Sequence, residues 1–170
     1  MSTDPEDFFE TAASANMLEI KSGGSTAWIT MAEGTGLDCR IDKLEAAPAI
    51  KCILRVLGFN KGSFLVRPYR HPESVRLGIA VPELLVDGLF KLDEMTVLRQ
   101  RLPDGNGVAL SLARPLLAPL SALDEADLDI LQLAHNTGTV NAVLDGSSET
   151  DLEAAQRLLS LLDGGYLRKA

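Results

Sequence analysis

The chain has 170 residues, of which 46% are apolar and 24% are charged, enough material for one globular domain or two small ones. Its formal net charge of −8 argues against a general affinity for nucleic acid or for an anionic membrane, because both select clustered lysine and arginine. Cys39 and Cys52 make neither a disulfide framework nor a metal-ligand spacing, so each is expected to be a small buried residue.

The sequence also indicates where in the cell the protein is expected. No apolar run reaches the length of a membrane span, and residues 1–10 lack the apolar core of a secretory signal peptide. We therefore expect a cytoplasmic protein that does not insert into a membrane.

The first part of the chain is predicted to form an antiparallel meander. A short helix is expected over 8–15. Runs rich in alternating and β-branched residues predict three strands, at 17–21, 26–31 and 37–41. The turns between them contain glycine, at 22–25 and 33–36, and glycine adopts positive φ without steric penalty.

The next segment changes from strand to helix and back. Leucine at helical spacing predicts a helix that starts with Pro48 in its first turn and ends at Gly58. A fourth strand is predicted over 63–67, and Pro68 is expected to stop it.

The longest helical pattern covers 81–102, with Pro82 in the first turn. Its apolar residues form a wide stripe of Leu84, Leu85, Leu89, Phe90, Leu92, Met95 and Leu98. A face this broad is expected to be covered from more than one side. Gly88, in mid-helix, predicts the close approach of another backbone, with a simply tolerated glycine as the alternative.

The last fifty residues resemble a separate unit. After a predicted strand at 108–112, three short helices and a short strand at 166–168 follow, the outline of a winged-helix-like unit. Capping-box patterns at 121–124 and 148–151 predict two of the helix starts.

The predicted fold class is therefore α+β. It combines a small antiparallel sheet with helices, a long central helix and a winged-helix-like three-helix C-terminal unit. The predicted domains are 8–112, which includes the central helix, and 121–170.

The sequence shows no pattern of a reaction centre. The motifs of zincins, α/β-hydrolases, P-loop proteins and CxxC sites are absent. Asp93 and Glu94 are neighbours in a helix and diverge by about 100°, so they are expected on a solvated or partner-facing surface and not as a catalytic pair. His135 at a helix end is explained by the helix dipole. We expect no catalytic residue, no cofactor and no bound metal.

Charge is divided unevenly along the chain. Residues 51–101 carry nine cations against five anions, whereas residues 121–170 carry nine acidic residues against three basic ones. The densest basic stretch is the loop 67–76. It either pairs with the acidic C-terminal unit and aids solubility, or binds an acidic protein or a nucleotide. The acidic C-terminal unit would repel phosphates, which argues against a nucleic-acid partner.

The order of these segments resembles the PATAN family, bacterial regulatory modules often joined to two-component receivers. The matching stretches are 17–23, 26–36, 54–66, 84–95 and 101–103, followed by a tri-helical segment over 123–167. The resemblance covers about residues 8–167. The chain departs from it at 37–40, where the family usually has a glycine and then an alanine. The resemblance implies a protein–protein interaction role in signalling, motility or cell polarity, and no catalytic residues.

The resulting hypothesis is a non-enzymatic adaptor that binds other proteins of a signalling or motility system, with a homodimer left open. Its working surface is expected in the 67–76 loop, on the exposed side of the central helix or at the open sheet edge. The candidate partner-binding residues are Arg67, Arg70, His71, Arg76, Lys91, Asp93 and Glu94. Two alternatives stay open: a transcription regulator that binds DNA through the C-terminal unit, and a small-ligand or nucleotide sensor.

Overall fold

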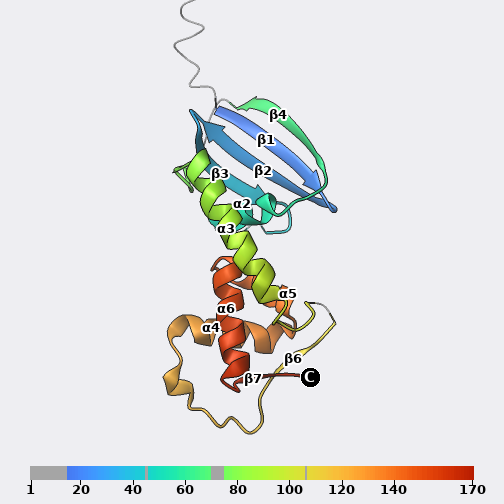
Figure 1. Cartoon of the computed structure of the whole chain (residues 1–170), viewed down its shortest axis with the longest axis vertical. Coiled ribbons are helices and arrows are strands. Elements are labelled where there is room, and N and C mark those ends of the chain that lie inside the picture. The colour runs from blue at the N-terminus through green and yellow to red at the C-terminus, as the bar shows by residue number, and fades with distance from the viewer. Residues whose placement is uncertain (1–14, 45, 70–74, 106) are drawn as a thin grey trace, which may run out of the picture. The chain divides into compact units, whose positions relative to one another are not determined.

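A computed structural model describes residues 15–44, 46–69, 75–105 and 107–170. The helix predicted over 8–15 lies outside this part of the chain, except for Ala15. The chain forms two compact units, and the division falls between Leu89 and Phe90, inside the longest helix, α3 (Val81–Arg99) (Figure 1). A five-stranded antiparallel sheet together with helices confirms the predicted α+β class.

The first unit contains this sheet, in the strand order β4-β1-β2-β3-β5. The strands are β1 (Ala15–Ser22), β2 (Ser25–Ala32), β3 (Thr35–Ile41), β4 (Ser63–Tyr69) and β5 (Ile79–Ala80). Gly23 and Gly24 join β1 to β2 with φ of 57° and 78°, the two positive values that a two-residue hairpin turn requires. The predicted meander of the first three strands is confirmed.

One face of the sheet is covered by α2 (Ala49–Leu57). The buried side chains of this core are Ala27, Ile29, Cys39, Ile41, Cys52, Ile53, Val56 and Leu84. The start of α2 differs slightly from the prediction, because Pro48 is the extended N-cap residue and the helix begins at Ala49. Gly58 ends the helix with φ of −79°, so no left-handed residue is needed there.

A bulge in β3 anchors the segment that leads into α3. The β2–β3 register shifts next to Met31, which leaves Leu37 without an opposite residue. The carbonyl oxygen of Leu37 instead accepts hydrogen bonds from the N–H groups of Arg76, at 2.8 Å, and Leu77, at 3.0 Å. The segment 75–78 is thereby fixed to the sheet ahead of β5.

The predicted end of β4 was wrong. The strand continues through Pro68 to Tyr69. This is possible because β4 is an edge strand, and a proline in an edge strand can turn its missing N–H toward the open side.

The expectation that the whole apolar stripe of the central helix is covered was also wrong. Leu84, Gly88 and Met95 are buried, but Leu85, Leu89 and Phe90 are exposed. The close approach predicted at Gly88 exists, but the prediction that a backbone makes it was wrong. The neighbour is a side chain, and a Cβ atom at this position would collide with Cδ1 of Leu57.

The second unit packs three helices with a small sheet. The helices are α4 (Glu125–Thr137), α5 (Val140–Gly146) and α6 (Asp151–Asp163), preceded by the 3-10 turn η1 (Leu120–Ala122). The antiparallel strands β6 (Leu110–Leu112) and β7 (Leu167–Lys169) complete the winged-helix-like unit.

This unit begins earlier than predicted. The end of α3 and the strand β6 had been assigned to the first domain. Met95, Leu102 and Leu110 instead belong to the core of the second unit, and β6 pairs with β7. β6 belongs to the second unit because its hydrogen-bonded partner is β7, which lies more than fifty residues later in the chain.

Two capping boxes are present, but each begins two or three residues later than the predicted patterns at 121–124 and 148–151. Asp124 caps α4 together with Asp127, and Thr150 caps α6 together with Glu153. In each box the cap is an extended residue whose side chain accepts from the backbone N–H three residues later.

Gly62 lies directly before β4, where the chain passes close to the backbone of β1. A Cβ atom at Gly62 would collide with the backbone carbonyl oxygen of Lys21, which cannot move without distorting β1. We expect Gly62→Ala to lower the free energy of unfolding of the first unit by roughly 1–3 kcal/mol. Asn60→Ala, at an exposed neighbouring position, should change it by less than about 0.5 kcal/mol. Denaturant unfolding would measure both, and equal stability of the two variants would contradict the prediction.

Candidate functional site

Among the candidate residues of the predicted basic loop, Arg67 and Arg76 lie in the described part of the chain, and their surroundings differ. Arg67 lies on β4 with an exposed side chain, 3.9 Å from a carboxylate oxygen of Glu19. Arg70 and His71 lie outside the described residues. The side-chain hydrogen bond from Lys21, helped by the charge of Arg67, holds the pKa of Glu19 below its usual value.

Arg76 has a structural contact. Its Nε donates to Asp38 at 2.7 Å, and its Nη2 donates to the carbonyl oxygen of Cys39 at 3.1 Å. Asp38 is buried and also accepts from Nε of Arg40 at 3.0 Å. Arg76 therefore fastens the segment 75–78 to β3, beside the backbone bonds to Leu37.

The three predicted site residues on α3 have different surroundings. Asp93 and Glu94 are exposed, whereas Lys91 is half-buried. The pKa of Glu153 is lowered first by the hydrogen bond from Thr150, and the charge of Lys91 adds to this effect. Lys91 therefore lies near the start of α6 and belongs to the electrostatics of the second unit.

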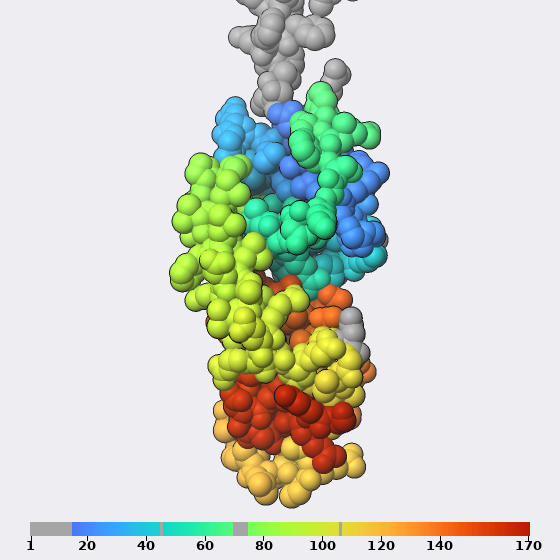
Figure 2. Space-filling model, turned by 45° about the vertical axis from the view of Figure 1, so that its right-hand side comes forward, coloured from blue at the N-terminus to red at the C-terminus, as the bar shows by residue number. Residues whose placement is uncertain are grey.

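One exposed apolar surface lies on α3. We call it the α3 face, and it consists of Leu85, Val86, Leu89 and Phe90. Val86 is 70% exposed and Phe90 is 66% exposed. In Figure 2 the yellow-green atoms of this part of α3 lie at the surface. Exposed apolar residues that are contiguous in space mark binding surfaces.

Acidic residues flank the α3 face. The exposed carboxylates along the same helix are Glu83, Asp87, Asp93 and Glu94. None of them makes an ion pair with another residue of the described chain. The helix thus presents an apolar centre with a negative margin.

A second exposed apolar surface lies at the free edge of the sheet. Phe64 on β4 is 75% exposed and Val66 is 52% exposed. Beside them, an open groove of about 370 Å³ is lined mainly by apolar side chains, among them Leu18, Ile20 and Phe59. Pro68 is the sequence signal for this edge, because a proline inside a strand indicates an edge position.

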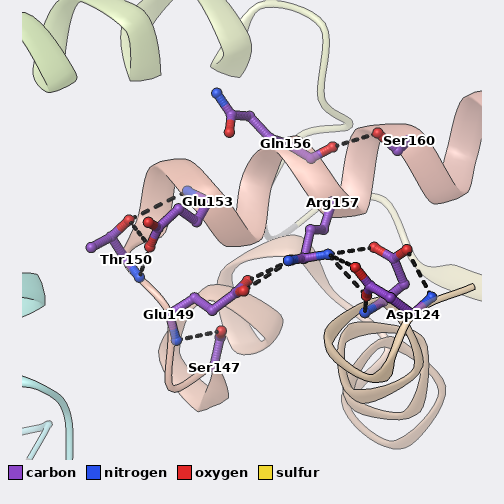
Figure 3. Close-up of polar contacts among 9 residues, drawn as sticks. Asp124, Ser147, Glu149, Thr150, Glu153, Gln156, Arg157 and Ser160 are labelled. Carbon is purple, nitrogen blue, oxygen red and sulfur yellow. Dashed lines mark hydrogen bonds and ion pairs between the residues drawn. The ribbon is translucent and has the colours of Figure 1, made fainter.

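Arg157 lies at the centre of an ion-pair cluster in the second unit (Figure 3). Arg157 on α6 donates from Nε to Glu149 at 2.9 Å and from Nη1 to Asp127 at 2.9 Å and Asp124 at 3.1 Å. The backbone N–H of Asp127, and then Arg157, hold the pKa of Asp124 below its ordinary value. The only cation of α6 is therefore already bound by three carboxylates.

Neither cysteine is placed to act as a nucleophile. Burial raises the pKa of both Cys39 and Cys52, so each stays a protonated thiol and a poor nucleophile. Within the described residues, no three side chains of His, Cys, Asp or Glu gather as metal ligands. In the same residues, every buried side-chain nitrogen or oxygen has a hydrogen-bond partner.

The described helices include none that combines the length and the apolar character needed to span a bilayer. Comparisons with protein-family models, with curated proteins and with solved structures found no match.

The two described arginines of the basic loop should differ in their effect on stability. Arg76→Met removes the cation that bonds the buried Asp38, and we expect the free energy of unfolding to fall by about 1–3 kcal/mol. Arg67→Met alters an exposed side chain with one long ion pair and should change it by less than about 0.5 kcal/mol. Denaturant unfolding compares the two, and a larger loss for Arg67→Met would refute the structural role of Arg76.

Arg157 should make the stability of the second unit depend on pH. The folded-state pKa of Asp124 is lowered, so its contribution is complete above the ordinary value of 3.8 and is lost as the pH falls through the folded value. We expect Arg157→Met to lower the melting temperature at pH 7, because three carboxylates lose their shared cation. The difference from the wild type should shrink toward pH 3, as the pH approaches the lowered pKa of Asp124 and this carboxylate loses its charge. Thermal melts at both pH values check this, and a difference independent of pH would rule out an electrostatic origin.

Proposed function

We propose that the protein is a non-enzymatic adaptor that binds other proteins of a bacterial signalling, motility or cell-polarity system, in the cytoplasm, through the α3 face. The resemblance to the PATAN family supports the same class of function. Of the three surfaces expected from the sequence, which are the basic loop, the exposed side of the central helix and the open sheet edge, the proposal uses the helix.

The observation that carries the proposal is the exposure of Val86 and Phe90 on a regular helix. Complete burial of an apolar side chain of this size in a complex contributes about 1.5–3 kcal/mol of favourable transfer free energy to binding. The helix backbone is already formed, so binding would order only side chains. A helix face of this kind suits a partner segment that lays its own apolar side chains along it.

The charges beside the α3 face indicate what kind of segment fits. Asp93 and Glu94 were candidate partner-binding residues from the sequence, and both are exposed next to the apolar side chains. Together with Glu83 and Asp87 they favour lysine and arginine at the margin of the contact. The expected partner is therefore a basic, amphipathic segment of another protein.

The DNA-binding alternative receives little support from the second unit. The exposed residues of α6 are Glu153, Gln156, Ser160 and Asp163. None of them is a cation, and Arg157 is engaged by carboxylates. A helix that enters the major groove would need donors for bases and phosphates on this side.

The sensor alternative stays a prediction. The described groove beside β4 is open and mainly apolar, which does not favour the phosphates of a nucleotide. A nucleotide that raises the melting temperature of the purified protein would support it.

Affinity capture with exchanged side chains tests the α3 face. The variant Val86→Lys with Phe90→Lys places two cations where a basic partner must lie, at positions that are exposed and should tolerate them. We expect this variant to lose at least 90% of the partners that the wild type retains from lysate of the native cell, measured by quantitative mass spectrometry. Leu117→Lys is the matched control, because Leu117 is 89% exposed and lies outside α3. An unchanged set of partners in the double variant, with its circular dichroism preserved, would contradict the proposal.

A further inference from the structure

The free edge of β4 has backbone groups whose direction can be worked out from the first hairpin. Ser22 and Ser25 flank the two-residue turn and pair with each other, so the N–H and C=O groups of Ser22 point toward β2. Since direction alternates along a strand, the same groups of Ile20 and Leu18 also point toward β2. The odd-numbered residues of β1 therefore bond to β4.

The register then shows which residues of β4 face outward. Lys21, Glu19 and Met17 lie opposite Ser63, Leu65 and Arg67, so these three β4 residues bond to β1. The backbone groups of Phe64 and Val66 consequently point to the open side. Pro68 follows the same alternation, and its missing N–H faces the open side, where edge strands tolerate proline. The register from the first hairpin and the position of Pro68 thus both indicate that the backbone groups of residues 64, 66 and 68 point to the open side.

The open edge is self-complementary about Val66. In an antiparallel pair with the two-fold axis at Val66, the whole strand overlaps with its copy. The N–H of Val66 donates to the carbonyl of Val66 of the second copy, and the N–H of Phe64 donates to the carbonyl of Pro68 of the second copy. Both bonds occur twice by symmetry, which gives four backbone hydrogen bonds between the copies. Pro68 has no N–H to donate to the carbonyl of Phe64 of the second copy, so the two return bonds of this pair are absent.

The side chains agree with this register. Phe64, Val66 and Pro68 lie on one face of the sheet, so Val66 meets its copy and Phe64 meets Pro68 of the second copy, next to the apolar groove. On the other face Arg67 lies opposite Leu65 of the second copy. No like charges lie directly opposite, and Glu19 of the same chain balances Arg67.

We propose that β4 is the interface of a homodimer, in which two copies pair their β4 strands antiparallel about Val66 and form one continuous ten-stranded sheet. The proposal uses a surface different from the α3 face and stands independently of it. An exposed apolar edge strand can pair with a strand of another chain, and the symmetric pairing covers Phe64 and Val66 of both copies.

A cysteine at the two-fold axis provides the test. Residues directly opposite in a hydrogen-bonded antiparallel pair have Cα atoms about 5.5 Å apart, a distance that suits a disulfide. We expect full-length Val66→Cys, at micromolar concentration with copper–phenanthroline as the oxidant, to give a covalent dimer as the main product on non-reducing gels. The two native cysteines are buried and should not react.

Ser63→Cys is the matched control on the same strand. In the proposed register the two copies of residue 63 lie about 20 Å apart, six positions at about 3.4 Å each, so no disulfide should form. Cross-linking of both variants to the same extent would indicate random collision and overturn the proposal. Failure of Val66→Cys to cross-link would overturn it as well.

The mass of the unmodified protein gives a second readout. Light scattering after gel filtration should give twice the chain mass of 18.2 kDa at high concentration. Val66→Lys, which brings two cations together on the axis, should shift the dimer to monomer by at least tenfold in dissociation constant, whereas Ser63→Lys should leave it unchanged. A monomeric wild type at 100 µM would refute the proposal even if every variant folds.

Discussion

The contact between α2 and α3 decides which surface this protein presents. Gly88 lies against the side chains of Leu57 and Leu54, and the absence of a Cβ atom allows α3 to come this close. Once Gly88 and Leu84 face the sheet core, the geometry of a helix turns Val86 and Phe90 into water. An apolar helix that is covered on one side only must either find a partner or leave that surface exposed. The proposed adaptor function makes use of this exposed surface.

Acidic side chains have two different roles in this protein. In the second unit Arg157 joins Asp124, Asp127 and Glu149, and two capping boxes use further acidic residues at helix starts. Much of the negative charge there serves helix capping and packing. Along α3 the carboxylates beside the α3 face have no ion-pair partner among the described residues. The same residue types therefore stabilise helix starts in one place and remain available for binding along α3.

The edge of the sheet shows how a local turn determines a remote surface. The two glycines between β1 and β2 determine which backbone groups of β1 point toward β4. That alternation carries over to β4 and decides which of its groups reach the open side. Pro68 fits only because its nitrogen lies on that side. A protein with two exposed apolar surfaces of different geometry, one helical and one extended, could hold a copy of itself and a partner simultaneously.

The sequence by itself determined the order of elements, because periodicity, glycine turns and helix caps are local signals: the β1–β3 meander, α2, α3 and the three C-terminal helices could all be predicted. It could not determine which residues of α3 are buried, since the leucines at 84, 85 and 89 are chemically alike and only packing distinguishes them. It could not place β6 in the second unit either, because strand pairing joins residues more than fifty positions apart. Nor could it show that Arg76 and Arg157 are bound to carboxylates, because the partners come from distant parts of the chain. Tertiary structure therefore decided which charged and apolar residues support the fold and which remain available for binding.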